Sequence, residues 1–171
     1  DSLLSANYAD VATPVFLPYL NGERTPHDNP AARGVFFGLD TTVEQVDLYQ
    51  AVLEGVGFAL KEGYECLRQI VPAVSHFSLI GGGARSRIWA EILATILNAN
   101  IIRYKENMTG PAFGAARLAI LAVSGDKIEH VVREPEIEGI VEPHCDLLSQ
   151  YEEKYEKFKR LYMKLETEFV K

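Results

Sequence analysis

The fold of this chain is decided by Leu79-Ile-Gly-Gly-Gly-Ala-Arg-Ser-Arg87. In this stretch an apolar segment ends in three glycines, and a polar segment follows them. Residues His76 to Ile80 are typical of a strand. Residues Ser86 to Asn98 carry apolar side chains at helical spacing, which predicts a helix. A strand that enters a helix through a glycine turn indicates an α/β fold with at least one parallel strand pair.

The glycine turn is also a candidate ligand site. Gly81, Gly82 and Gly83 have no Cβ atom, so the backbone can adopt positive φ and lie against a phosphate or an adenine ring. The free N–H groups of the helix start can donate to an anion. The glycine spacing matches neither a dinucleotide-binding GxGxxG motif nor a P-loop. A strand-to-helix turn without a ligand is the alternative interpretation, and Arg85 and Arg87 are either phosphate ligands or solvated residues.

Further elements are expected on both sides of this segment. A helix is expected to begin after Thr41 or Thr42, and Pro111 suits the first turn of another. Asn21-Gly22 is a strong turn dipeptide. The expected helices span 42–68, 110–122 and 147–169; the expected strands span 34–39, which should be buried, and 101–104; residues 127–143 are expected to be irregular. The small-residue helix at 110–122 is expected to pack closely on a sheet or on another helix.

Composition favours one globular domain over residues 1–171. The chain is 47% hydrophobic and 24% charged, too apolar for disorder and long enough to bury one core. Its 17 basic and 24 acidic residues give a net charge of −7, which excludes the electrostatic footprint of a nucleic-acid or anionic-membrane binder. No apolar run reaches the roughly 20 residues of a membrane span, and no signal peptide is recognisable. A cytoplasmic location is therefore expected.

No metal site is predicted. Cys66 and Cys145 are far apart and lack ligand spacing, so both are interpreted as packing residues in a reducing compartment. The polar turn Asn21 to His27 holds an acid, a base and a histidine, and is either a functional loop or an ordinary surface loop. The other three histidines are isolated from one another: His76, His130 and His144.

A second pattern resembles the C-terminal signature of the FGGY carbohydrate kinases. The resemblance covers about residues 12 to 165, with further matching segments at 16–27, 32–34, 80–86 and 110–116. Every constrained position of the signature is filled, by Gly34, Phe36, Gly38, Leu39, Asp47, Leu48, Ala51, Val52, Leu53 and Glu54.

This resemblance implies a ribonuclease H-like, actin-like ATPase domain, the C-terminal half of a two-domain sugar kinase that holds MgATP and a sugar between its domains. The helix opening at Gly110 would pack behind the nucleotide pocket, and the turn from Gly22 to His27 would face the interdomain region. Arg87 would border the adenine pocket, where the family's glycerol kinases have Asn. The implied cofactor-binding residues are Gly81, Gly82, Gly83, Ala84 and Arg87.

The resemblance also implies what this chain lacks. The sugar pocket and the catalytic aspartate belong to the N-terminal half of the family, so no catalytic residue is assigned here, and Asp1, Asp10 and Asp28 lie outside the catalytic motif. The chain alone is expected to be inactive. Because it begins at Asp1 without Met, it is expected to be an excised piece of a longer protein.

The complete enzyme is expected to phosphorylate a sugar hydroxyl from ATP with Mg²⁺, with the 5-hydroxyl of D-xylulose as the first candidate. Another ketose, a polyol or a sugar acid is the second, and a non-catalytic actin-like interaction module is the third. The expected partners are the N-terminal half of the same kinase and a second copy of the chain, which would form a homodimer through an exposed cleft face.

Overall fold

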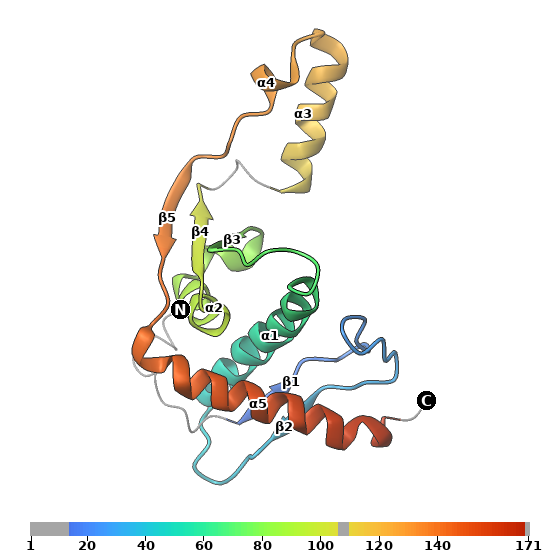
Figure 1. Ribbon diagram of the computed structural model, residues 1–171, viewed down its shortest axis with the longest axis vertical. Coiled ribbons are helices and arrows are strands. Elements are labelled where there is room, and N and C mark those ends of the chain that lie inside the picture. The colour runs from blue at the N-terminus through green and yellow to red at the C-terminus, as the bar shows by residue number, and fades with distance from the viewer. Residues whose placement is uncertain (1–13, 106–109, 170–171) are drawn as a thin grey trace.

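The computed structural model describes residues 14–105 and 110–169, and it places a helical body below a small sheet and a projecting arm (Figure 1). In the body, α5 (Leu148–Leu165) lies across α1 (Gln45–Leu67). The antiparallel pair β1 (Val15–Leu17) and β2 (Val35–Phe37) packs against both helices through β1.

Aromatic side chains form the core of the helical body. Phe58 of α1 and Phe158 of α5 are fully buried, with their ring centroids 5.5 Å apart. Tyr19, from the segment after β1, meets Phe158 edge-on. A Cβ atom at Gly55 would lie 2.3 Å from the Phe16 carbonyl oxygen, so α1 approaches β1 too closely for any side chain there. The helices and β1 are thereby held as one packed unit.

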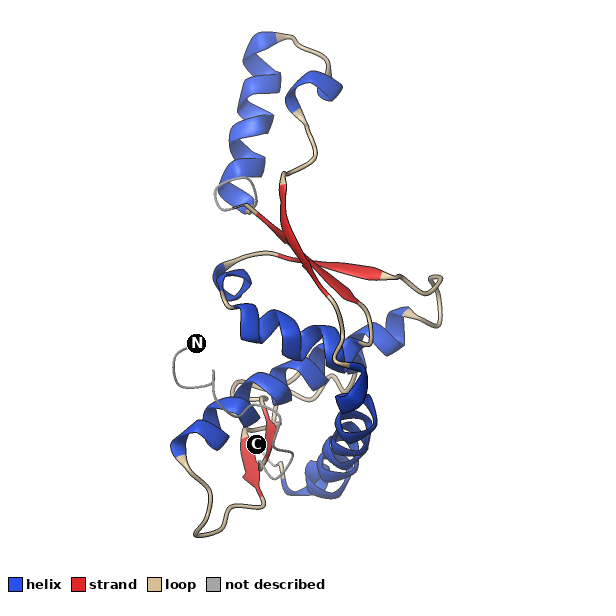
Figure 2. Cartoon of the chain, turned by 90° about the vertical axis from the view of Figure 1, so that its left-hand side faces the viewer, coloured by secondary structure: helices blue, strands red, loops and turns tan. Residues whose placement is uncertain are grey.

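The sheet contains β3 (His76–Leu79), β4 (Asn100–Tyr104) and β5 (Ile137–Val141), in that order. Strands β3 and β4 are parallel, which confirms the predicted parallel pair, and β5 is antiparallel to β4. Helix α2 (Arg87–Leu97) joins β3 to β4 and covers one face through Ala90, Leu93 and Ala94 against Ile101. Figure 2 shows the three strands crossing above this helix.

Three predictions about these elements were wrong. Residues 127–143 are not irregular, since they form α4 (Ile128–Val131) and β5. The predicted buried strand at 34–39 forms as β2, but Phe36 and Phe37 are 37% and 47% exposed. Successive side chains of a strand point to opposite faces, so both faces of β2 are partly uncovered in this two-stranded ribbon. The helix predicted to begin after Thr41 or Thr42 begins later, as α1 at Gln45. The Asp40 carboxylate accepts hydrogen bonds from the N–H and the hydroxyl of Thr42, which holds this segment in a turn before the helix.

Helix α3 (Pro111–Ser124) extends away from the body with α4 beside it (Figures 1 and 2). Pro111 occupies the first helical position, as predicted. The expectation of close packing is wrong for the described residues, because none of the residues of α3 is buried. Among the helices at 14–105 and 110–169, none is long and apolar enough to cross a membrane.

Both ends of α2 carry capping residues, at the two limits of the predicted helix. The Ser86 hydroxyl accepts a hydrogen bond from the Trp89 N–H at 3.1 Å, and Asn98 ends the helix in the left-handed region with φ of 46°. Replacing Ser86 by Ala should lower the free energy of unfolding by about 1 kcal/mol, since the Trp89 N–H loses its acceptor. Urea denaturation measures this change. Ser149→Ala, at an exposed position of α5, is the control, and equal midpoints for the two variants would contradict the capping role.

Candidate functional site

The glycine turn joins the end of β3 to the start of α2. Gly81 has φ of +86°, a left-handed value that L side chains rarely adopt. The next residues form a 3₁₀ turn, Gly82–Arg85, closed by a 3.1 Å hydrogen bond from the Ala84 N–H to the Gly81 carbonyl. The backbone therefore folds tightly at the carboxyl end of β3, where open α/β sheets bind their ligands.

A cavity of about 520 Å³ lies beside this turn. Its volume is within the range of small-molecule sites. The turn forms one wall, and the start of α3, where Gly110 has φ of +109°, forms another. The lining residues are Leu79, Gly81, Gly82, Ala84, Arg85, Arg103, Tyr104, Gly110, Pro111, Ala112 and Glu138. The parallel strand pair and α3 thus bring together segments that are separate in the sequence.

Arg103 connects three walls of the cavity. Its Nε donates to the Ala84 carbonyl oxygen at 3.0 Å, and its guanidinium lies 3.3 Å from the Glu138 carboxylate on β5. Arg103, on the central strand β4, therefore ties the glycine turn to the outer strand β5. With Arg85, it places two guanidinium groups where a phosphate would be attracted. Sequence analysis missed Arg103, although an arginine at the carboxyl end of a strand beside a glycine turn could have marked it.

The residues predicted from the sequence divide into two groups. Gly81, Gly82 and Ala84 line the cavity. Gly83 does not: a Cβ atom there would lie 3.1 Å from the Trp89 indole, so this glycine lets the turn pack on α2. Arg87 does not line it either, because its side chain is 77% exposed and its Nε lies 2.9 Å from Glu91.

The turn from Gly22 to His27 is fastened to the helical body. The His27 ring stacks on Tyr162 of α5 with centroids 3.6 Å apart, and its Nε2 lies 3.4 Å from the Glu62 carboxylate of α1. The Tyr19 hydroxyl donates to the same carboxylate. Burial raises the pKa of Glu62, and the neighbouring His27 opposes that rise. None of the cavity-lining residues comes from this turn.

Glu54, the acid that ends the signature pattern, is buried within α1. Glu54 is 3% exposed at its side chain and forms an ion pair with Lys154 of α5. Gln50 and the Tyr151 hydroxyl donate to the same carboxylate, at 2.8 and 3.2 Å. Glu54 therefore joins α1 to α5, and this position in the core assigns it a structural role.

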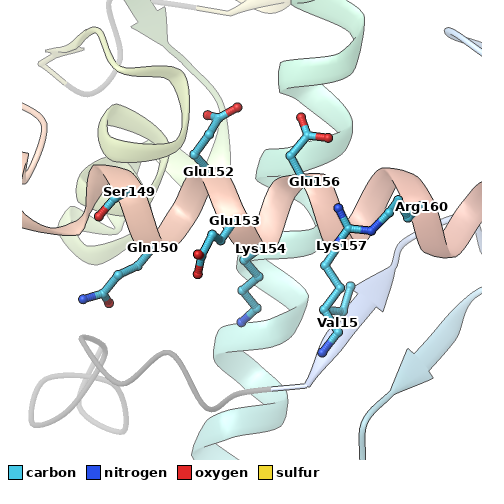
Figure 3. A pocket seen from close by; sticks show the side chains of 9 residues that line it. All are labelled: Val15, Ser149, Gln150, Glu152, Glu153, Lys154, Glu156, Lys157 and Arg160. Atoms are coloured by element: carbon cyan, nitrogen blue, oxygen red, sulfur yellow. The ribbon is translucent and has the colours of Figure 1, made fainter.

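A second hollow, of about 750 Å³, follows the surface of α5 (Figure 3). Glu152 and Glu156 point to one side of the helix, while Lys154 and Lys157 point to the other. Mixed charges that face different directions offer no consistent partner for one ligand. In residues 14–105 and 110–169, no group of three or more His, Cys, Asp or Glu could hold a metal ion.

Comparison with known proteins gives concordant matches. A family model described as the C-terminal domain of the FGGY family of carbohydrate kinases matches residues 1–123. The xylulose kinase of Escherichia coli strain K12 is 43% identical over 167 residues, 95% of this chain and 34% of that protein. The xylulose kinase of Klebsiella pneumoniae is 41% identical over 88% of this chain and 31% of that protein.

A solved structure agrees with these matches. The crystal structure of a xylulose kinase from Brucella ovis matches the fold with a TM-score of 0.82 and 39% identity, over 91% of this chain and 32% of that one. The chain thus spans about a third of the length of the relatives that it matches.

Proposed function

The chain belongs to the FGGY family of carbohydrate kinases and matches its C-terminal domain, and from this premise we propose that it is the ATP-binding domain of a sugar kinase. The proposed fold is the ribonuclease H-like, actin-like ATPase type, and the parallel pair β3 and β4 with the connecting helix α2 supports it. The observation that carries the proposal is the 520 Å³ cavity at the carboxyl ends of these strands, walled by the glycine turn.

In this proposal the nucleotide lies against Gly81, Gly82 and Ala84. The absence of side chains at the two glycines leaves their peptide surface open to an adenine ring or a phosphate. Arg85 and Arg103 supply positive charge toward the phosphates. Gly83 has an indirect role, since it lets the turn pack on Trp89. Arg87 lies outside the cavity lining and pairs with Glu91, so the proposal gives it no contact with the nucleotide.

Mg²⁺ enters with the nucleotide in this account. The described residues offer no carboxylate cluster of their own for the ion, so the ATP phosphates and the rest of the enzyme would hold it. When bound, Mg²⁺ neutralises charge on the phosphates. This chain binds and orients ATP, while the carboxylate that accepts the proton of the sugar hydroxyl comes from the N-terminal half of the kinase.

The proposed reaction of the complete enzyme is transfer of the ATP γ-phosphate to D-xylulose, which gives D-xylulose 5-phosphate. Support comes from the Escherichia coli and Klebsiella pneumoniae relatives, both xylulose kinases. Sugar specificity resides in the preceding part of the protein, so a different ketose, a polyol or a sugar acid is the alternative outcome of the test below.

A chimera tests this function. Joining the roughly two thirds of the Escherichia coli xylulose kinase that this chain does not cover to the 171-residue chain should restore phosphorylation of D-xylulose, because both halves of the cleft are then present. ADP release is followed with D-xylulose, D-ribulose, glycerol and gluconate. The chain alone and the N-terminal part alone serve as controls and should be inactive. A chimera that unfolds cooperatively but releases ADP with none of these substrates would contradict the proposal and favour a non-catalytic module.

A further inference from the structure

A single acidic residue lines the cavity beside the glycine turn. Among the described residues that form its walls, Glu138 of β5 is the one carboxylate. Its Oε2 atom lies 3.3 Å from the Arg103 guanidinium, and its side chain is 47% exposed. Because a carboxylate accepts up to about four hydrogen bonds, contact with one guanidinium leaves acceptor capacity for a ligand.

A β-bulge turns Glu138 toward the cavity. Arg103 of β4 lies opposite Gly139 of β5. The next residue of β4, Tyr104, lies opposite Ile137, so Glu138 has no partner on β4. In a regular strand Glu138 would point to the face of the sheet opposite to that of Arg103, since successive side chains alternate. The extra residue breaks this alternation and brings the carboxylate to the guanidinium, as bulges do beside active sites.

A carboxylate in a nucleotide cavity requires a hydrogen-bond donor from the ligand. The phosphates of ATP are acceptors and carry negative charge, so they do not lie against Glu138. The donors of the nucleotide are the two ribose hydroxyls and the amino group of adenine. Two neighbouring hydroxyls match the two oxygens of one carboxylate, and acidic residues hold ribose in this way in dinucleotide-binding folds.

Arg103 places Glu138 beside the ribose rather than beside the base. The ribose joins adenine to the α-phosphate, so a carboxylate in contact with a phosphate-directed arginine faces the sugar. The base has a separate position, because Leu79, the glycines of the turn and the start of α3 form walls without charged side chains. The charge of Arg103 also offsets that of Glu138, which lets the phosphates lie near by.

We propose that Glu138 selects ribonucleotides: its carboxylate accepts hydrogen bonds from the ribose hydroxyls of ATP, while Arg103 holds it in place. This inference rests on the proposed function, since it assigns one part of the nucleotide to one end of the proposed site. The cavity then binds ATP more tightly than 2′,3′-dideoxy-ATP, which lacks both hydroxyls.

Paired titrations test this assignment. MgATP and its 2′,3′-dideoxy analogue are titrated into the ¹⁵N-labelled 171-residue chain, and the affinities are taken from amide shifts at the glycine turn. The parent chain should bind MgATP at least about tenfold more tightly than the analogue, since hydrogen bonds to a charged group are lost. Glu138→Ala should weaken MgATP binding by the same factor. It should not weaken binding of the analogue, because removal of a negative charge favours a polyphosphate.

Glu136→Ala is the matched control. Glu136 carries the same charge two residues earlier, pairs with Lys105 and lies outside the cavity lining. This variant should keep the preference for MgATP. If Glu138→Ala unfolds at a much lower urea concentration than the parent chain, Glu138→Gln decides in its place. Its amide oxygen replaces only one carboxylate oxygen, so the preference should fall to less than half, and an unchanged preference would overturn the proposal.

The outcomes separate this inference from the proposed function. If the parent chain binds both nucleotides equally at the glycine turn, the role of Glu138 is overturned and the nucleotide site stands. Equal losses for both nucleotides in Glu138→Ala would leave the residue only its contact with Arg103 and would overturn the proposal. Loss of the preference in Glu136→Ala would assign it to long-range charge and overturn the proposal too. A parent chain that binds neither nucleotide would overturn the nucleotide domain, and this inference with it.

Discussion

Lys154→Met is expected to lower the free energy of unfolding by about 3–5 kcal/mol, because it leaves the Glu54 carboxylate buried without its cation. Both side chains are at least 94% buried, and they join α1 to α5. Gln50 and Tyr151 also donate to Glu54, but neither carries a charge that could replace the ammonium group. Urea denaturation followed by circular dichroism measures the loss.

Two further variants isolate the cause of this loss. Lys105→Met removes an exposed ion pair with Glu136 and should cost at most about 1 kcal/mol. Glu54→Gln combined with Lys154→Met removes both buried charges and should recover more than half of the loss, since the amide still accepts from Tyr151. If Lys154→Met and Lys105→Met cost the same, the ion pair is not the contact that joins the two helices.

The second large effect is expected at the ligand site. Gly82→Val should weaken MgATP binding at least about tenfold, which corresponds to about 1.4 kcal/mol. Gly82 lines the cavity, and a Cβ atom there meets no protein atom within 4 Å, so the new side chain would occupy the space assigned to the nucleotide. The same open space predicts little change in unfolding free energy, within about 0.5 kcal/mol.

Gly114→Ala is the matched control for this substitution. Gly114 lies in α3, outside the cavity lining, and its Cβ would also meet nothing within 4 Å. This variant should bind MgATP like the parent chain and gain slightly in helix stability. Titrations of both variants by isothermal calorimetry or amide shifts compare them. Equal affinities of Gly82→Val and the parent chain for MgATP would contradict the proposal that the nucleotide lies against the glycine turn.

Local signals made the centre of this fold predictable from the sequence. The three glycines after Ile80 indicated the turn, and the helical spacing of apolar residues between Ser86 and Asn98 indicated the helix. Each of these residues acts on backbone within a few positions of itself. Strand β5 was missed because its pairing is not local: Gly139 and Ile140 find their partners on β4, across the whole of α3. The acidic residues in and around this strand led to its interpretation as a polar, irregular segment.

The candidate site was predicted only in part for the same reason. Gly81 and Gly82 line the cavity, as predicted for a glycine turn that lies against a ligand. The 3₁₀ turn instead directs Gly83 toward Trp89. Arg87 lies close to the turn in sequence, but its exposed side chain pairs with Glu91 one helical turn later. Arg103 acquires its contact with Ala84 only when β4 lies beside β3. Sequence distance therefore gave an incomplete account of which residues surround the cavity.

The most direct test of the central claim is a titration of the ¹⁵N-labelled chain with MgATP, followed through backbone amide shifts. The nucleotide-binding account predicts saturable shifts at Gly81, Gly82, Ala84 and Arg85 and at the start of α3, with no comparable change along α5. Saturation should require more than micromolar nucleotide, since the N-terminal part is absent. Binding at micromolar affinity or better would contradict the explanation that this chain supplies only half of the nucleotide cleft. Shifts that saturate elsewhere, with the glycine turn unchanged, would contradict the site itself.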